Sequence, residues 1–452
     1  MYSKYICYIS IICSLLLMGS CQRSQEERSR ILKIYNWADY IDEDVLAEFP
    51  EWYKEQTGEE VEIIYQTFDI NEIMLTKIER GHEDFDVVCP SEYIIERMMN
   101  KDILQPINRN FGHTPDYIHN LAPYIQEELN KMSPDNRKVT DYAVAYMWGT
   151  AGTLYNKKLV TEEEAMTWKS LWDPKFTNKI LMKDSYRDCY GTAIIYANTD
   201  RINRGEVTVE QLMNDNSRTA INTAEEYLKR MKPNIAGWEA DFGKEMMTKE
   251  KAWLNFTWSG DAVWAIEEAD AVGVELDYIV PIEGSNVWFD GWVIPKYARN
   301  VKAASYFINY MCRPDIALRN MDAIGYVSAV ATPEVLEAKI DSTLETFSDL
   351  SYFFGPEADS IQIDPVQYPD KKVIERCAVI RDFSNKQDLE KVLEMWSRVK
   401  GDNLNTGIVL IIFAVFGALF VWIVINKVQK YRHQLHKNRR RRQSRRKKIS
   451  KP

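Results

Sequence analysis

The sequence predicts an α/β protein with two lobes, because short apolar stretches alternate with longer helical patterns along most of its length. Such alternation is typical of a largely parallel sheet, in which ligands bind at the carboxyl ends of the strands. It occurs in two successive series, and the second begins at about Tyr142. A chain of 452 residues with 45% hydrophobic content can bury a substantial core. We therefore expect two α/β lobes with a cleft between them rather than one very large sheet.

The first series opens with an apolar strand, ILKIYNW, at 31–37. A helical stretch follows it and ends near Gly58. Because proline lacks the N–H that a helix interior requires, Pro50 predicts two short helices here instead of one long helix. Asn71 has the pattern of a cap at the start of a later helix. The other predicted elements of this series are strands at 60–66 and 85–90 and helices at 71–80 and 92–100.

The second series supplies the remaining strands and helices. Its predicted strands lie at 142–156, 253–258, 277–281 and 288–295. Its predicted helices lie at 218–231, 260–269, 302–312 and 314–323. No internal repeat and no low-complexity linker divides the chain further before its basic C-terminal tail.

The C-terminal region has the pattern of a membrane span. Residues 407–425 (GIVLIIFAVFGALFVWIVI) are uncharged, and as a helix they would extend roughly 28 Å, close to one bilayer core. The tail at 427–452 has thirteen Lys or Arg and no Asp or Glu, which is typical of the cytoplasmic side of a span. A buried core helix is the alternative, but a core helix rarely leads into such a tail. We expect a transmembrane helix with the bulk of the chain on the opposite side.

The N-terminus has the pattern of a secretory signal peptide at 1–20. Lys4 precedes an apolar stretch at 5–18, and the small residues Gly19 and Ser20 directly precede Cys21. This cysteine resembles that of a bacterial lipobox, which implies that Cys21 carries a lipid. An uncleaved anchor helix is the alternative, and both interpretations place residues 22–402 outside the cytoplasm.

The charge of the chain is asymmetric. Before Lys427 there are 44 basic and 67 acidic residues, a net charge of −23, compared with −10 for the whole chain. An acidic exterior repels nucleic acid and attracts cations, although the same charge could serve only for solubility. The cysteines at 89, 189, 312 and 377 are widely spaced without metal-site spacing, and the sequence alone does not pair them.

Aromatic residues occur repeatedly where predicted strands end, and carboxylates at Asp39, Asp261 and Asp290 lie close to several of them. An aromatic face attracts an ammonium group, and a carboxylate adds a charge-assisted hydrogen bond. Together they suit a flexible organic cation with an apolar stem, whereas the alternative is that the rings fill the core and the aspartates cap helices. The aromatic residues are Trp37, Tyr40, Tyr93, Trp258, Trp288 and Tyr326.

Signals of catalysis are weak. The chain has no GxSxG, P-loop, GxGxxG after a strand or HExxH motif, and its five histidines form no recognisable triad or zinc pattern. We therefore expect a binding protein without a catalytic residue, cofactor or metal.

Several phrases together carry a resemblance to a known family. The chain from Ile31 to about Gly325 resembles the spermidine/putrescine-binding proteins of bacterial polyamine ABC transporters. The resemblance implies a type II periplasmic two-lobe fold, the Venus flytrap, that closes on putrescine or spermidine and docks on a membrane permease driven by an ATPase. The phrases are IYNWADYI (34–41), FDVVCPSEYIIERM (85–98), YMWGTAGTLYN (146–156), SLWDP (170–174), WSGDAVWA (258–265), WFDGWVIP (288–295), INYMCRPDIA (308–317) and AIGYVSA (323–329).

The lobe boundaries follow from this resemblance. Lobe 1 is expected at 31–146 with about 286–328, and lobe 2 at 147–285 with about 329–400. The resemblance also implies the ligand-binding residues. They are Trp37, Tyr40, Ser91, Tyr93, Asp188, Trp258, Asp261, Trp288, Asp290 and Tyr326.

The chain departs from the family pattern at three positions of the site. Ser185 replaces an acid of spermidine-preferring relatives, and Ile380 aligns with their glutamine. Asp261 resembles the pattern of putrescine-preferring relatives, so the resemblance favours a shorter dication. The C-terminal span is a further departure. A membrane-anchored polyamine sensor, an extracytoplasmic enzyme and a binding protein for another organic cation remain as alternatives.

Overall fold

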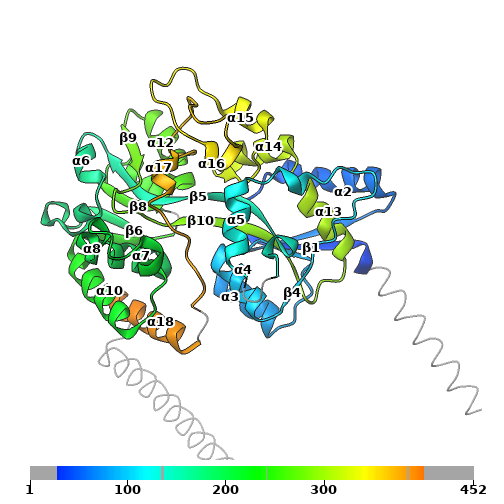
Figure 1. The fold of residues 1–452 in the computed structure, drawn as a ribbon, viewed down its shortest axis with the longest axis horizontal. Helices are drawn as coiled ribbons and strands as arrows, with labels where there is room; N and C mark the ends of the chain where they lie inside the picture. The colour runs from blue at the N-terminus through cyan, green and yellow to red at the C-terminus, as the bar shows by residue number, and fades with distance from the viewer. Residues whose placement is uncertain (1–27, 134–136, 241, 384–385, 402–452) are drawn as a thin grey trace, which may run out of the picture. The chain divides into compact units, whose positions relative to one another are not determined.

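The computed structural model describes residues 28–133, 137–240, 242–383 and 386–401 (Figure 1). The chain divides into two compact units, Met1–Leu393 and Glu394–Pro452, and the fold below is that of the first. The predicted signal peptide, the lipid site at Cys21, the span at 407–425 and the tail at 427–452 lie outside the described residues. Within the described part, no helix combines the length and apolar character that crossing a bilayer requires.

The strands form a mixed sheet. Strand β1 (Ile31–Trp37) pairs in parallel with β2 (Glu62–Phe68) and β3 (Val87–Val88). At the other end, β6 (Ile180–Lys183) pairs in parallel with β7 (Ile235–Glu239) and β8 (Leu254–Trp258). Between them, β10 (Val287–Pro295) is antiparallel to both β3 and β5 (Ala143–Asn156), and β5 is antiparallel to β8. The order is β2-β1-β3-β10-β5-β8-β6-β7, and the short strands β4 (Leu104–Gln105), β9 (Leu276–Ile279) and β11 (Val327–Ser328) join at β10 or β5.

The predicted parallel sheet is thus correct for the two outer groups of strands and wrong for the middle. The reason is that β5 and β10 pair antiparallel along most of their length and run through the centre of the fold (Figure 1). The first part of β5, up to Thr150, pairs with β10, and the part from Ala151 pairs with β8. One strand therefore belongs to both halves of the sheet.

The hydrophobic core divides into two clusters, although the strands pair into one continuous sheet. One large core cluster contains buried apolar residues of β1, β2, β3 and β10. A second cluster lies around Leu154, Leu181 and Ala262. All fourteen residues of β5 are buried, and they reach from the first cluster to the second. These two cores agree with two lobes, but the lobe boundaries at single-residue level stay a prediction.

Helices cover the sheet. Most predicted helices of both series occur within a few residues of the expected bounds. The helices of the first unit are α2 (Glu43–Thr57), α3 (Asn71–Glu79), α4 (Glu92–Asn100), α5 (Pro123–Lys131), α6 (Glu162–Ala165), α7 (Tyr186–Ala197), α8 (Thr199–Asn203), α9 (Val209–Met213), α10 (Arg218–Met231), α11 (Gly243–Thr248), α12 (Ser259–Asp270), α13 (Val301–Met311), α14 (Pro314–Ile324), α15 (Pro333–Lys339), α16 (Ser351–Phe354) and α17 (Lys371–Ile374). A last helix, α18 (Lys386–Lys400), crosses the boundary between the two units.

Two local predictions were wrong. Helix α2 continues through Pro50, because Val45, Phe49 and Tyr53 are buried on one face on both sides of the proline. Packing of that face outweighs the one backbone hydrogen bond that proline cannot make. Asn71 does not cap α3 with its side chain; it donates hydrogen bonds to Ser91 and Tyr93 instead.

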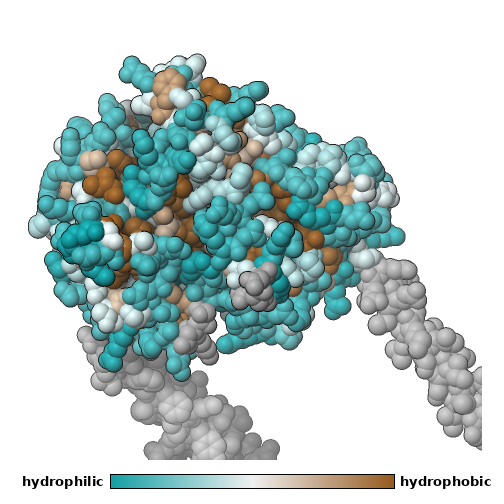
Figure 2. Space-filling view, viewed as in Figure 1, coloured by the Kyte–Doolittle hydropathy of each residue, from teal (hydrophilic) through white to brown (hydrophobic). Residues whose placement is uncertain are grey.

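The face of the protein shown in Figure 2 is mostly hydrophilic. Hydrophilic side chains cover most of the face in Figure 2, and apolar residues show between them in small areas. Such scattered apolar exposure is usual at a protein surface and marks no docking surface by itself.

Candidate functional site

Residues from three distant segments meet around Asp290. The Tyr40 hydroxyl donates a hydrogen bond of 2.9 Å to Asp290 Oδ2. Ser91 and Asp290 form an isolated antiparallel bridge, and the Ser91 hydroxyl also bonds the Asp290 carboxylate. The β5–β10 register shifts between Asp290 and Gly291, and a bulge of this kind re-aims a side chain.

A chain of aromatic rings extends from this carboxylate. Tyr326 lies edge-to-face against Tyr40 and against Trp288, with ring centroids 5.4 Å apart in each pair. The ring centroids of Trp288 and Trp258 are in turn 6.5 Å apart. Five residues of this region are buried, with only 7–9% of their surface exposed. They are Tyr40, Asp188, Asp261, Trp288 and Asp290. We refer to Tyr40, Ser91, Asp188, Trp258, Asp261, Trp288, Asp290 and Tyr326 as the acid–aromatic cluster.

Two glycines let these rings approach the backbone. A Cβ at Gly260 would lie 2.4 Å from ring carbons of Tyr326, and one at Gly149 would lie 2.8 Å from a ring carbon of Trp288. Both positions therefore require glycine if the rings are to keep their places. The glycines of the WSGD and MWGT phrases thus have a packing role at the cluster.

Asp188 lies at the start of α7. The Ser185 side chain caps that helix and donates a hydrogen bond of 2.6 Å to Asp188 Oδ2. Asn286 donates to Asp188 Oδ1 at 3.0 Å. Burial raises the pKa of Asp188, although the hydrogen bonds from Ser185, Asn286 and Trp258 oppose the shift. Ser185 therefore replaces an expected acid with a donor that holds Asp188 in place.

Burial also raises the pKa of Asp290, to about 6, against the opposing hydrogen bonds from Ser91 and Tyr40. Glu92 is a buried neighbour that sequence reasoning missed, although it stands between Ser91 and Tyr93 in the chain. Burial, followed by the charges of Asp290 and Asp188, raises the pKa of Glu92 well above its usual value. Among the described residues, no Lys or Arg forms an ion pair with Asp188, Asp290 or Glu92.

Asp261 is in a different electrostatic situation. Lys183 Nζ lies 2.5 Å from Asp261 Oδ2, and Lys244 Nζ lies 3.7 Å from Asp261 Oδ1. Burial would raise the pKa of Asp261, but the two lysines outweigh it and lower that pKa. The Tyr326 hydroxyl also donates to Asp261 at 3.0 Å. No spacing in the sequence pointed to Lys183, because it reaches Asp261 only when β6 pairs with β8.

The two other predicted site residues lie farther along the same region. Tyr93 accepts a hydrogen bond of 3.1 Å from Asn71, which also donates to Ser91, so it joins the cluster through Asn71. Trp37 packs against Phe68, with ring centroids 4.6 Å apart. Its buried indole N–H has no hydrogen-bond partner in the described part of the chain. The structure thus gathers eight predicted residues directly and one through Asn71, whereas Trp37 packs against Phe68 of β2.

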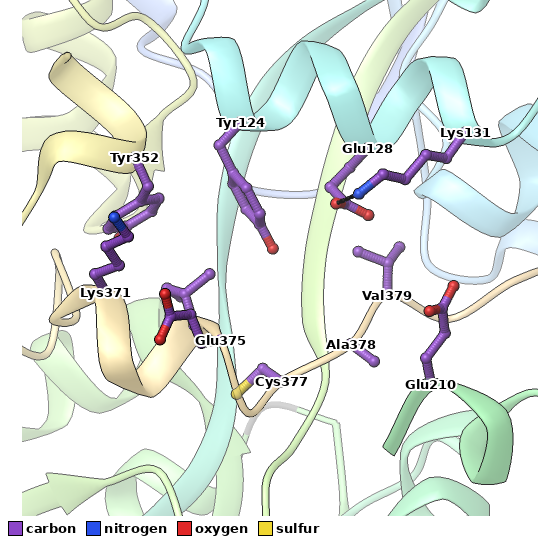
Figure 3. Close-up of a pocket in the computed structure, with 11 residues that line it drawn as sticks. Tyr124, Glu128, Lys131, Glu210, Tyr352, Lys371, Glu375, Cys377, Ala378 and Val379 are labelled. Atoms are coloured by element: carbon purple, nitrogen blue, oxygen red, sulfur yellow. Dashed lines mark hydrogen bonds and ion pairs between the residues drawn. The ribbon is translucent and has the colours of Figure 1, made fainter. Parts of the chain in front are cut away.

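A separate hollow of about 280 Å³ lies between α5, α9 and the segment around Cys377 (Figure 3). Its lining includes Tyr124, Tyr352 and acidic and basic side chains, with Lys131 2.6 Å from Glu128. Cys377 carries a free thiol there. None of the acid–aromatic cluster lines this hollow, so it is a different feature of the surface.

Comparison with known proteins gives the family. The family model for bacterial extracellular solute-binding proteins matches residues 51–344. The chain is 29% identical over 332 residues to the "Spermidine/putrescine-binding periplasmic protein" of Salmonella typhimurium, covering 73% of this chain and 84% of that protein. It is also 29% identical to the "Putrescine-binding periplasmic protein PotF" of Escherichia coli, covering 68% and 80%.

Solved structures agree with these relatives. The spermidine/putrescine ABC transporter substrate-binding protein PotD of Streptococcus pneumoniae aligns with a TM-score of 0.61 and 29% identity, covering 82% of this chain and 98% of that one. The TpPotD lipoprotein of Treponema pallidum has a TM-score of 0.61 at 20% identity and supports the fold alone. The resemblance to polyamine-binding proteins and the type II solute-binding fold are thereby confirmed. The chain belongs to the bacterial extracellular solute-binding proteins, and its function is to bind a solute outside the cytoplasm.

Proposed function

We propose that this protein is the extracytoplasmic polyamine-binding component of an ABC transporter, which captures putrescine or spermidine and delivers it to a membrane permease. Two kinds of observation support the proposal. Its relatives carry polyamine-binding names. Its acid–aromatic cluster has the chemistry that a protonated amine with a methylene stem requires, namely carboxylates beside ring faces.

The observation that carries the proposal is the state of Asp290. Its carboxylate is buried, bonded by Tyr40 and Ser91, and without a positive partner among the described residues. A buried anion without a counter-charge is costly, and an ammonium group supplies that charge. Trp288 and Tyr326 beside it would hold the adjoining methylene groups.

Binding must involve opening, because five of the eight cluster residues are only 7–9% exposed and the rings of the cluster already contact one another. We assign lobe 1 to 31–146 with about 286–328 and lobe 2 to 147–285 with about 329–400. The lobes separate to admit the amine and close on it again. Closure excludes water, and charges attract more strongly at the lower effective dielectric.

The finer details of location are part of the same proposal. Lipid on Cys21 and a helix at 407–425 would hold the protein on the periplasmic side of the inner membrane, with the tail at 427–452 in the cytoplasm. Tethering raises the effective concentration of the binding protein beside its permease and the permease's ATPase. We expect no nucleic-acid partner and no catalytic step.

Titration calorimetry of the full chain tests the proposal. Putrescine and spermidine should release heat and saturate one site, and 1,4-butanediol, which has the same stem as putrescine without charge, should not. An absence of binding by both amines would overturn the proposal. Tight binding of a different organic cation in their place would move the chain to another solute.

A further inference from the structure

Four charged side chains, three of them buried, lie at one end of the acid–aromatic cluster. Lys183, at the end of β6, is 1% exposed, and its ammonium lies 3.1 Å from Glu239 and 2.5 Å from Asp261. It donates a further hydrogen bond of 2.9 Å to the Ala240 carbonyl. Lys244 Nζ lies 3.7 Å from Asp261 Oδ1, whereas Lys183 contacts Oδ2. Two lysines and two carboxylates make this group neutral.

The ammonium of Lys183 has the surroundings expected for an ammonium of the ligand. It contacts two carboxylates and a carbonyl, and it lies 4.7 Å from the ring centroid of Trp258. An ammonium over an indole face is held by the ring quadrupole. Lys183 therefore occupies one face of the Trp258 ring and satisfies Asp261 with a charge that belongs to the protein.

The carboxylates at the other end of the acid–aromatic cluster, unlike Asp261, have no ion pair with a lysine or arginine among the described residues. Asp188, Asp290 and Glu92 are buried, and their hydrogen bonds come from neutral side chains or backbone N–H groups. None of these three carboxylates forms an ion pair with another described residue. Carboxylates without an ion-pair partner are thus concentrated around Asp290 and Asp188, although the positive charge of the buried Arg187 also acts on Asp188. The region around Asp261 is already neutral.

Burial alone would lower the pKa of Lys183, but the charges of Asp261 and Glu239 outweigh burial and raise it. Lys183 is therefore charged across the physiological pH range. A second cation brought to Asp261 would meet both Lys183 and Lys244.

We propose that Lys183 is a specificity-determining residue, a built-in cation that takes the place of one ligand ammonium and restricts the site to amines with two charged nitrogens. This inference rests on the proposed polyamine-binding function and adds a physical reason for a preference for putrescine over spermidine. Asp188 and Asp290 receive the two nitrogens of a diamine, and a third nitrogen directed toward Asp261 is repelled by Lys183. A triamine must leave that nitrogen in a less favourable place.

Calorimetry on the unmodified full chain is the first test. We expect putrescine to bind at least tenfold more tightly than spermidine. A ratio below threefold, or tighter binding of spermidine, would overturn the role of Lys183 while leaving the polyamine function standing. Failure of both amines to bind would instead overturn the proposed function, so the two failures are distinguishable. A ratio between threefold and tenfold counts for Lys183 only if the variants below shift it.

Two variants test the residue itself. Lys183→Met uncovers Asp261 and should improve spermidine binding relative to putrescine by about tenfold. The double variant Lys183→Met/Asp261→Asn removes both partners and should return the ratio toward that of the unmodified chain. Circular dichroism checks that each variant is folded. A folded Lys183→Met protein with an unchanged ratio would contradict the proposal, and if that variant does not fold, the ratio of the unmodified chain decides, with the tenfold value as its threshold.

Discussion

The Tyr40 hydroxyl lies 2.9 Å from Asp290 Oδ2 and donates a hydrogen bond to it, although 250 positions separate the two residues in the chain. Tyr40 follows β1, whereas Asp290 lies within β10, with β3 between these strands in the sheet. Asn36 fixes the turn after β1 by donating a hydrogen bond to the Tyr40 carbonyl at 3.1 Å. The sheet order therefore brings a phenol to a buried carboxylate, and the proposed ligand site is built around that pair.

Asp290→Asn should abolish most of the affinity for putrescine. Loss of one member of a buried charge pair costs about 2–5 kcal/mol, which corresponds to at least about 30-fold in Kd. The ligand-free variant should unfold at the same temperature or higher, because an amide is not penalised by burial as the carboxylate is. Calorimetry and thermal unfolding measure the two effects.

Asp364→Asn is a matched control. Asp364 is also a carboxylate whose pKa is raised by burial, but it accepts its hydrogen bond from the Val366 N–H, and no residue of the acid–aromatic cluster bonds it in the described part of the chain. The affinity of the Asp364→Asn variant for putrescine should equal that of the unmodified chain. Equal losses in both variants would show that the effect of Asp290→Asn is not local.

Polyamine binding should weaken as the pH falls below about 6. The pKa of Asp290 is raised to about 6, and only the ionised carboxylate attracts an ammonium group, so Kd at pH 5 should be about tenfold weaker than at pH 7. Near pH 6 binding should release a proton, which appears in calorimetry as a dependence of the enthalpy on the buffer. The Asp290→Asn variant should lose this pH dependence, and a flat profile in the unmodified chain would contradict the role of Asp290.

The same carboxyl affects stability without ligand. Its pKa is higher in the folded state than in the unfolded state, so its contribution is complete below about pH 4 and is lost as the pH rises through 6. Two pKa units correspond to roughly 3 kcal/mol in the free energy of unfolding. Urea unfolding at pH 4.5 and pH 7 should show this trend in the unmodified chain and a smaller one in Asp290→Asn. An identical trend in both proteins would assign it to other groups.

Asp382→Ala should destabilise the fold strongly. Arg97 Nη2 lies 2.7 Å from Asp382 Oδ1, and the two side chains are only 9% and 3% exposed. Removal of one partner leaves a buried charge and should cost about 3–5 kcal/mol in urea unfolding. Glu60→Gln breaks the exposed pair with Lys54 and should cause no measurable change. The double variant Arg97→Met/Asp382→Ala should recover part of the loss, and no recovery would argue against a charge effect.

Gly260→Ala should disturb the site without removing any contact residue. Its Cβ would lie 2.4 Å from ring carbons of Tyr326, so that ring must move, at a cost of about 1–3 kcal/mol in stability and a weaker affinity for putrescine. Gly191→Ala in α7 is the control, because its Cβ would meet Met213 at an ordinary 3.5 Å. That variant should be neutral or more stable by up to about 1 kcal/mol. Equal effects of the two substitutions would mean that Tyr326 is not held by the close approach.

Local patterns in the sequence predicted much of this arrangement. The aromatic–acid phrases around Trp258 and Trp288 are short, and their rings do meet. Long-range charge pairing was not predictable, because Lys183 reaches Asp261 only through the pairing of β6 with β8.

Other errors also came from tertiary context. The buried face of α2 carried the helix through Pro50, and the antiparallel pairing of β5 with β10 depends on contacts far apart in the chain. Asn71 had the pattern of a cap, but its amide bonds Ser91 and Tyr93 across the site. Each case depends on partners that no local window of sequence contains.

A crystal structure of the full chain with putrescine is the most direct measurement of where the ligand binds. We expect one ammonium nitrogen within about 2.7–3.2 Å of an Asp290 carboxylate oxygen, with the methylene stem against Trp288. Putrescine in the hollow beside Cys377 or on the exterior, with the Tyr40–Asp290 hydrogen bond unchanged, would contradict the proposed site.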